Sequence, residues 1–499
     1  MNDMENSVLD RGYLTVPLHE RSFGTEVTGD FTLPDYQNEI RRILHVSCTV
    51  LPPAKYVSDS SVEFNGTLDY QVLYVGGDGG MYSVPLSSDY SFNVPLDKGA
   101  NADMISDVDV LCSISAESIN TRVSAPRRLS IRCRIRPNVR IYGRIPSFTG
   151  AFNEVDPTSV YTRSEKCESL LCESATSDII NVSYTFAPSS DDIRVVCADA
   201  TVRISDKVGG ASGVSCRGNV AFRLLCMHEE SGELETLDAQ TPFEGEVDME
   251  MGGTDAECRI RGVLSEMSVN IGEAGIECNA GIILDAQTCR NAPVEYTADV
   301  YSTAAECECS TRRMSVRNSL ACLSSNFTVS ERIPLSSTSV PEGAQIIGGL
   351  SNVCMDKCSA DAGRYSFGGN AVFTVLYSND GDVYSADVSV PVKFESEGAG
   401  AEPVAFDAVA EADGMTLRIA DGNLCIDAEM MICADCLGEQ MIESVDRATF
   451  GESIGARECE LVVCYPAPDD TLWSVAKRYK VAPSAVSGDV ASDKYVILE

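Results

Sequence analysis

The segment Gly66-Thr-Leu-Asp-Tyr-Gln-Val-Leu-Tyr74 returns in altered form as Gly218-Asn-Val-Ala-Phe-Arg-Leu-Leu-Cys226 and as Gly369-Asn-Ala-Val-Phe-Thr-Val-Leu-Tyr377. The three glycines stand 152 and 151 residues apart. Solenoid repeats have periods of about 20 to 50 residues, so a period this long indicates copies that are each large enough to form a domain. We therefore interpret the chain as three tandem copies of one module, at residues 1–150, 151–300 and 301–450.

Turns and alternating strands recur in phase with these glycines. A connector rich in Gly, Asn, Asp and Glu follows each glycine segment, at residues 76–80, 228–232 and 378–382. They are typical of tight hairpins, because Gly, Asn and Asp tolerate positive φ. Apolar and polar residues alternate in stretches such as Ile131-Arg-Cys-Arg-Ile135, which predicts strands with one buried and one solvated face. The expected fold is mostly β, with three tandem β-sandwich-like modules.

Composition limits the classes of partner. The 499 residues carry a net charge of −37, which opposes binding to phosphate backbones and anionic membranes, so we expect no nucleic-acid partner. The first residues lack the basic segment and apolar core of a secretory signal. The sequence contains no run of about eighteen apolar residues, so it predicts no membrane span. We expect a protein that stays inside the cell.

One stretch of the chain is strongly basic. Alternation places Arg132, Arg134 and Arg136 on one strand face, opposite Ile131, Cys133 and Ile135. The simplest interpretation is a solvated face with acidic neighbours. The functional alternative is a docking stripe for an acidic partner or for another repeat, with charge complementarity setting the register.

The sequence offers little for catalysis or metal binding. It has three histidines, and none occupies an equivalent place in two repeats. The 21 cysteines are odd in number and unevenly spaced, which favours reduced thiols in strands. Neither Cys307-Glu-Cys309 nor Cys433-Ala-Asp-Cys436 has a second pair at a familiar zinc spacing. We expect no enzyme activity, no metal site and no cofactor.

The last forty residues change character. Asp470 or Thr471 is an N-cap candidate, and Leu472, Val475, Ala476 and Tyr479 follow at helical spacing. Apolar segments at 461–464 and 495–498 flank this helix. The pattern predicts a small α+β unit at residues 455–499, in which Trp473 belongs to the core.

The motif Asp470-Thr-Leu-Trp-Ser-Val-Ala-Lys-Arg-Tyr-Lys-Val481 resembles the LysM family. The resemblance implies a βααβ fold with a groove for N-acetylglucosamine chains, between the loop that holds Asp-Thr-Leu and the loop before the last strand. The residues that it nominates as ligand-binding are Asp469, Asp470, Thr471 and Leu472 on one wall and Gly488, Asp489 and Val490 on the other.

The N-terminal region resembles the SPOCS family, modules that occur with a terminal LysM in spore coat and spore envelope morphogenetic proteins. The residues that carry this likeness are Gly29-Asp-Phe-Thr-Leu-Pro-Asp35, Ile40-Arg-Arg-Ile-Leu44 and the Gly66 segment. The two resemblances imply a noncatalytic scaffold at the developing spore surface, in the mother-cell cytoplasm. Its LysM-like unit would dock a morphogenetic protein partner such as an ATPase. The alternative is a peptidoglycan-binding protein of the cortex or cell wall.

Overall fold

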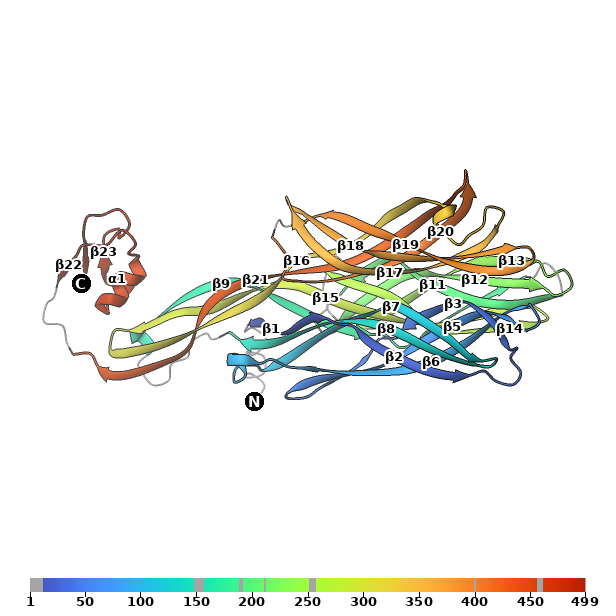
Figure 1. The fold of residues 1–499 in the computed structure, drawn as a ribbon. Helices are drawn as coiled ribbons and strands as arrows, with labels where there is room; N and C mark the ends of the chain where they lie inside the picture. The colour runs from blue at the N-terminus through green and yellow to red at the C-terminus, as the bar shows by residue number, and fades with distance from the viewer. Residues whose placement is uncertain are drawn as a thin grey trace.

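The computed structural model describes residues 12–147, 157–187, 192–210, 212–250, 257–398, 401–455 and 461–498. Strands dominate this part of the chain, and its one α-helix lies in the C-terminal unit (Figure 1). The mostly-β prediction is confirmed. No helix in these ranges combines the length and the apolar character that a bilayer crossing requires.

The first stretch, residues 13–146, forms two antiparallel sheets. In one sheet the long strand β8 pairs with β7 along one edge and with β1 and β2 along the other. In the second sheet β5 pairs with β6 along one edge and with β3 and β4 along the other. The strand bounds are β1 Tyr13–Ser22, β2 Thr25–Thr32, β3 Ile40–Val50, β4 Ala54–Val57, β5 Ser61–Gly76, β6 Met81–Pro95, β7 Asp107–Ala125 and β8 Arg128–Pro146.

The second and third stretches, residues 160–302 and 305–453, repeat this strand order. In the second, β15 pairs with β14 and with β9 and β10, while β12 lies between β11 and β13. In the third, β21 lies between β16 and β20, and β18 lies between β17 and β19. The bounds are β9 Val160–Thr176, β10 Ile180–Phe186, β11 Ile193–Gly209, β12 Gly213–His228, β13 Leu234–Asp248, β14 Cys258–Gly272, β15 Gly275–Ser302, β16 Ala305–Pro334, β17 Gln345–Asp361, β18 Arg364–Asn379, β19 Asp382–Glu397, β20 Ala405–Ala420 and β21 Asn423–Ser453.

In each stretch the two sheets face each other over one apolar core. Phe64 of β5 and Ile131 of β8 share a buried cluster in the first stretch. Phe222 of β12 and Ile282 of β15 do so in the second, as do residues of β18 and β21 in the third. The predicted alternation is confirmed for Ile131, Cys133 and Ile135, which are fully buried.

The glycine segments form the middle strands β5, β12 and β18, and each leads into a hairpin with the next strand. The last of these turns has Asp380 at φ 53° and Gly381 at φ 83°, as a tight hairpin requires. On the other edge of each middle strand, the register shifts immediately after Ile43, Val195 and Ile346. These residues pair with Tyr74, Cys226 and Tyr377, the last residues of the three glycine segments.

A second set of bulges aligns the other three sheets. The register shifts after Ala116 in β7, after Leu264 in β14 and after Ala412 in β20. The residues opposite are Ile135, Ile282 and Met430. Because a bulge fixes the register, equivalent residues of the three stretches can be matched by counting from it. Five residues beyond these positions stand Arg140, Gln287 and Asp435.

Two equivalent contacts join the first stretch to the second and to the third. Arg194 of β11 lies 4.5 Å from the centre of the Tyr82 ring in the first stretch and donates to the Met81 carbonyl at 3.0 Å. The equivalent Arg42 of β3 lies 4.2 Å from the ring of Tyr384 in the third stretch and donates to the Val383 carbonyl. The first stretch therefore uses different surfaces toward its two neighbours, which is a head-to-tail arrangement.

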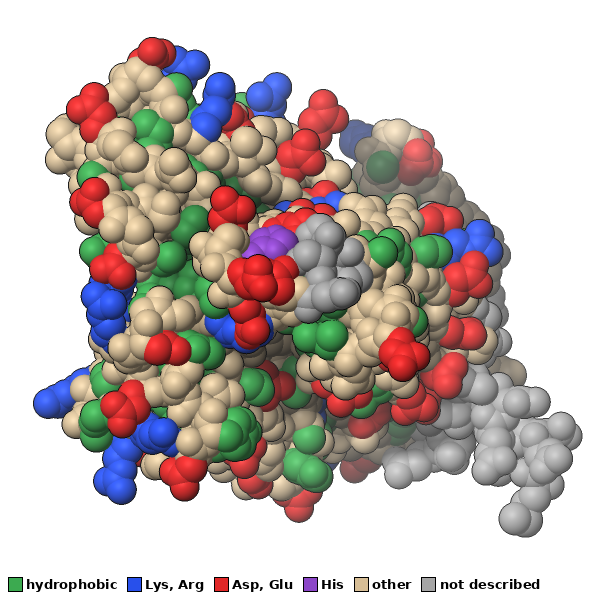
Figure 2. Space-filling view, turned by 90° about the vertical axis from the view of Figure 1, so that its right-hand side faces the viewer, with side chains coloured by type: hydrophobic (Ala, Val, Ile, Leu, Met, Phe, Trp, Pro, Cys, Tyr) green, Lys and Arg blue, Asp and Glu red, His purple; other side chains and the backbone are tan. Residues whose placement is uncertain are grey.

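The three stretches also share interior clusters. One is apolar and contains Leu44, Leu73, Val196 and Leu376, from β3, β5, β11 and β18. Another contains Leu111, Tyr142, Leu170, Cys289 and Leu437. Figure 2 views the body from the end away from the C-terminal unit, where acidic side chains are spread over the visible surface.

The remaining elements are short. Three 3-10 turns interrupt the body: η1 Gly99–Asn101, η2 Pro157–Ser159 and η3 Leu335–Ser337. The C-terminal unit contains β22 Val462–Cys464, α1 Leu472–Tyr479, η4 Pro483–Ala485, β23 Val486–Ser487 and β24 Val496–Leu498. It lies at the end of a long arm made by parts of β9, β15, β16 and β21 (Figure 1).

Candidate interaction sites

The predicted helix of the C-terminal unit is confirmed. Thr471 is the N-cap, and it exchanges hydrogen bonds with Ser474 in a capping box. Within residues 461–498 the second helix implied by the LysM resemblance is absent: a single 3-10 turn, η4, leads directly into β23. The five residues between Val481 and Ser487 are too few for two helical turns, which need about seven. The βααβ expectation is therefore corrected to strand, helix, 3-10 turn and two strands.

On the first predicted wall of the ligand groove, two of the four residues are already hydrogen-bonded within the C-terminal unit. The Asp470 carboxylate accepts hydrogen bonds from Ala467 N at 2.8 Å, Ser474 Oγ at 3.2 Å and Arg478 Nη1 at 3.1 Å. The bond from Arg478 is the main cause of the lowered pKa of Asp470. Thr471 is occupied as the helix cap, whereas Asp469 and Leu472 are exposed.

The second predicted wall is a turn that satisfies its own polar groups. Gly488 has φ 110°, and Asp489 accepts bonds from Ala491 N at 3.0 Å and Ser492 Oγ at 2.7 Å. Val490 packs in the core of the unit and is 8% exposed. Of the seven nominated residues, Asp469 and Leu472 have exposed side chains that take no part in the hydrogen bonds described above.

An apolar strip on the same unit was missed by the sequence reasoning. Val463 of β22, Tyr465 and Tyr495 are 46%, 67% and 51% exposed. Cys464 and Val496 point to the core, so alternation places Val463 and Tyr465 on the outer face. The rings of Tyr465 and Tyr495 lie 6.2 Å apart. We call Val463, Tyr465 and Tyr495 the outer strip; apolar residues spaced by two on a short strand were the available signal.

The helix of this unit rests on the arm. Trp473 Nε1 donates to Asp299 Oδ2 at 2.8 Å, and Lys477 pairs with the same carboxylate at 2.5 Å. The Tyr301 hydroxyl donates to Val481 O at 2.7 Å, and its ring meets Trp473 edge-on. Burial opposes the ionisation of Asp299, but Lys477 and Trp473 outweigh it and lower its pKa. Trp473 thus serves packing, as expected.

The structure places the arginine stripe on one face of β8, with acidic neighbours in the same sheet. Arg132 pairs with Glu26 at 3.4 Å, and Glu117 of β7 pairs with Arg134 at 2.8 Å and with Arg136 at 2.6 Å. The bond to Glu117 raises the pKa of Arg136. Docking by this stripe stays a prediction.

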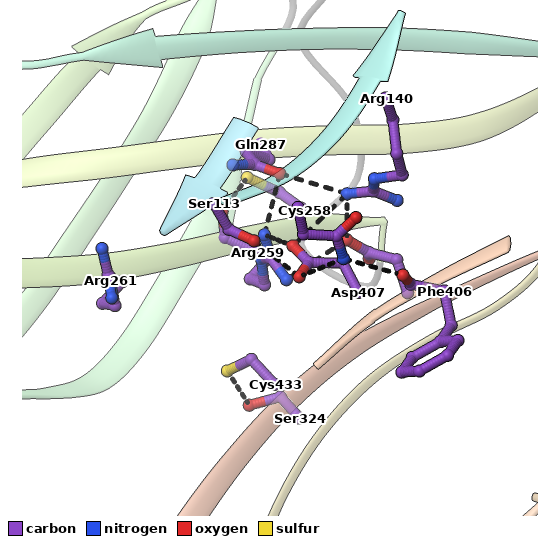
Figure 3. Close-up of polar contacts among 12 residues, drawn as sticks. Ser113, Arg140, Cys258, Arg259, Arg261, Gln287, Ser324, Phe406, Asp407 and Cys433 are labelled. Atoms are coloured by element: carbon purple, nitrogen blue, oxygen red, sulfur yellow. Dashed lines mark hydrogen bonds and ion pairs between the residues drawn. The ribbon is translucent and has the colours of Figure 1, made fainter. Parts of the chain in front are cut away.

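Farther along the same face of β8, Arg140 lies in a buried polar cluster where the three stretches meet (Figure 3). Arg259 Nη2 donates to Asp407 Oδ2 at 2.6 Å and to Gln287 Oε1 at 2.8 Å. Arg140 and Asp435 complete the cluster, with Asp435 Oδ2 3.5 Å from each guanidinium. Two arginines and two aspartates leave it without net formal charge.

The electrostatics of this cluster are dominated by pairing. Burial opposes the ionisation of Asp407, but Arg259, Arg140 and a hydrogen bond from Ser113 lower its pKa far below the ordinary value. Breaking such a buried pair is strongly destabilising, because it leaves an uncompensated charge. We assign the cluster to holding the stretches in register. Sequence reasoning missed it, although Arg140, Gln287 and Asp435 are polar residues at equivalent positions.

The comparisons with known proteins bear on the first stretch. Residues 39–120 match the SipL, SPOCS domain family. The match covers β3 to β6 and most of β7, and it supports the SPOCS resemblance. No LysM domain is detected in the chain. No curated protein and no solved structure matched the chain.

Proposed function

We propose that the chain is a noncatalytic interaction protein of spore envelope assembly, acting at the developing spore surface in the mother-cell cytoplasm. The observation that carries this proposal is the SPOCS match over residues 39–120. The SPOCS domain points to a sporulation-related protein. The recurring strand order supports treating residues 151–300 and 301–450 as further modules of the same kind.

In this proposal the 455–499 unit docks a morphogenetic protein partner such as an ATPase. The outer strip supports it, since exposed Tyr residues are frequent anchors of protein interfaces. The helix already contacts the arm through Trp473 and Lys477, which leaves the strand face for a partner. Glycan binding is the weaker alternative, because Asp470, Thr471 and Asp489 are engaged in local hydrogen bonds.

Capture from extracts of sporulating cells tests the proposal. The full chain is compared with a Tyr465→Ser/Tyr495→Ser variant and with Tyr56→Ser, a control at a tyrosine of β4 that is 60% exposed. We expect one stoichiometric nucleotide-binding partner with the native chain and the control, and its loss with the double variant. Equal capture by all three chains would contradict the assignment of the outer strip. Sedimentation with purified peptidoglycan and no protein partner would favour the glycan alternative.

A further inference from the structure

An open cavity of about 730 Å³ lies between the three stretches. Strands of all three stretches line it, among them β3 and β7, β11 and β14, and β17 and β20. Binding sites for small molecules have volumes of about 300 to 1,000 Å³, so this space is large enough for one. No part of the proposed interaction role uses it.

The bulges that align the stretches also order the lining. Counting from the shifts after Ile43, Val195 and Ile346, one level of the cavity carries Ser47, Asp199 and Leu350 at equivalent positions. The next level on the same strand faces carries Thr49, Thr201 and Asn352. The lining therefore offers hydroxyl and amide groups beside one carboxylate, instead of a purely apolar wall.

Asp199 is a carboxylate of the lining that makes no ion pair among the described residues, although Arg223 stands opposite it in the β11–β12 ladder and favours its ionised form. Protein surrounds it closely enough for burial to raise the pKa of its carboxyl. Its side chain is nevertheless exposed, which fits a group that faces an internal space. Its one hydrogen bond comes from the adjacent Ala200 N at 2.8 Å. Within the described residues, no Lys, Arg or His lies within ion-pair distance of it.

The other charges in the lining are already paired. Arg203 lies 2.5 Å from Asp413, Arg223 lies 2.8 Å from Asp238, and Arg261 lies 3.6 Å from Glu411. The cavity thus has one carboxylate in excess. Among the described residues Asp199 makes no ion pair, and a ligand cation in the pocket would supply a counter-charge to it.

We propose that this cavity binds a small hydroxylated organic ammonium ion, with its ammonium group on Asp199 and its hydroxyl groups facing Thr49, Thr201 and Asn352. An ammonium group offers three donors to the carboxylate. Asn352 Nδ2 already donates to the Ala116 carbonyl at 2.9 Å, which leaves its amide oxygen to accept from a ligand. The hydroxyls of Thr49 and Thr201 donate or accept as the ligand requires.

Calorimetric titration of the full chain with D-glucosamine and with D-glucose tests the proposal, because the two sugars differ by one ammonium group. We expect glucosamine to bind with a dissociation constant below about 10 mM and glucose to bind at least about tenfold more weakly. Asp199→Asn should weaken glucosamine binding at least about tenfold. Asp206→Asn, at an exposed position of the same strand outside the cavity lining, should leave it unchanged.

Thermal melting provides a check that does not depend on calorimetry. Glucosamine should raise the Tm of the native chain and of Asp206→Asn, but not that of Asp199→Asn. Without ligand, Asp199→Asn should melt close to the native chain, because the side chain is exposed and accepts one hydrogen bond, from Ala200 N. Absence of glucosamine binding, equal binding of glucose, or unchanged affinity in Asp199→Asn would each overturn the proposal.

Discussion

At the residue scale, β8 shows how the position of a residue along a strand decides its role. Arg132 and Arg134 are exposed, and Arg136 is half-buried, whereas Arg140 on the same face is 1% exposed. The strand begins at the solvent-exposed edge of the first stretch and ends where it is covered by the second and third stretches. Alternation was therefore predictable from sequence, but the burial of Arg140 was not. The available signal was that Val139, Ile141 and Tyr142 are apolar on both faces, which indicates a strand covered on both sides.

His45 makes a second residue-scale prediction. Burial lowers its pKa to about 4, against about 6.5 in an unfolded chain. Between these values the unfolded state binds one more proton, so stability should fall as pH decreases from about 6.5 to 4, by about 3 kcal/mol in total. Denaturant unfolding of His45→Asn at pH 7 and pH 4.5 should show a smaller difference than the native chain.

Asp407 does not complicate that comparison. Its pKa is lowered in the folded state, so its contribution is fully present above the unfolded value near 3.9 and is lost only as pH falls below it. An identical pH dependence in His45→Asn and the native chain would show that His45 is not held neutral by burial.

At the element scale, the repeated glycines have a steric explanation. A Cβ on Gly218 would overlap the backbone carbonyl of Arg203, and one on Gly369 would overlap that of Cys354. Both carbonyls lie beside bulges of the neighbouring strand. At Gly66 the obstacle is the Tyr90 side chain, which can move. The sequence revealed the repetition, whereas its cause depends on the register between strands.

Alanine substitutions test this explanation. Gly218→Ala and Gly369→Ala should each lower the free energy of unfolding by about 1–3 kcal/mol, because backbone must shift to admit the methyl group. Gly66→Ala should cost less. Gly272→Ala, where nothing lies within 4 Å of the added atom, should change stability by less than about 0.5 kcal/mol in urea titrations. Equal effects at all four glycines would contradict the steric account.

The C-terminal unit shows the limits of element prediction. Its helix follows from the cap at Thr471 and the apolar spacing of Val475 and Ala476, which are local signals. The replacement of a second helix by η4 and β23 depends on segment length and on pairing with β24. Contacts such as Trp473 with Asp299 join residues far apart in the chain, and no local pattern encodes them.

At the scale of the whole molecule, the three stretches share one interior. The contacts of Arg42 and Arg194 with the neighbouring stretches, the apolar cluster at Leu44 and the polar cluster at Arg140 all use equivalent positions. Repetition was readable from the sequence because it preserves local patterns. The packing of the copies around a common interior was not, since their contact positions carry different residues, such as Arg140, Gln287 and Asp435.

A double-mutant cycle between Arg259 of the second stretch and Asp407 of the third tests this shared interior most directly. Stabilities of Arg259→Met, Asp407→Asn and the double variant give the coupling free energy. We predict at least about 1.5 kcal/mol, against less than about 0.5 kcal/mol for the exposed pair Arg217 and Glu244 within the second stretch. Additive effects at Arg259 and Asp407, to within about 0.5 kcal/mol, would contradict a common interior in which the three stretches meet.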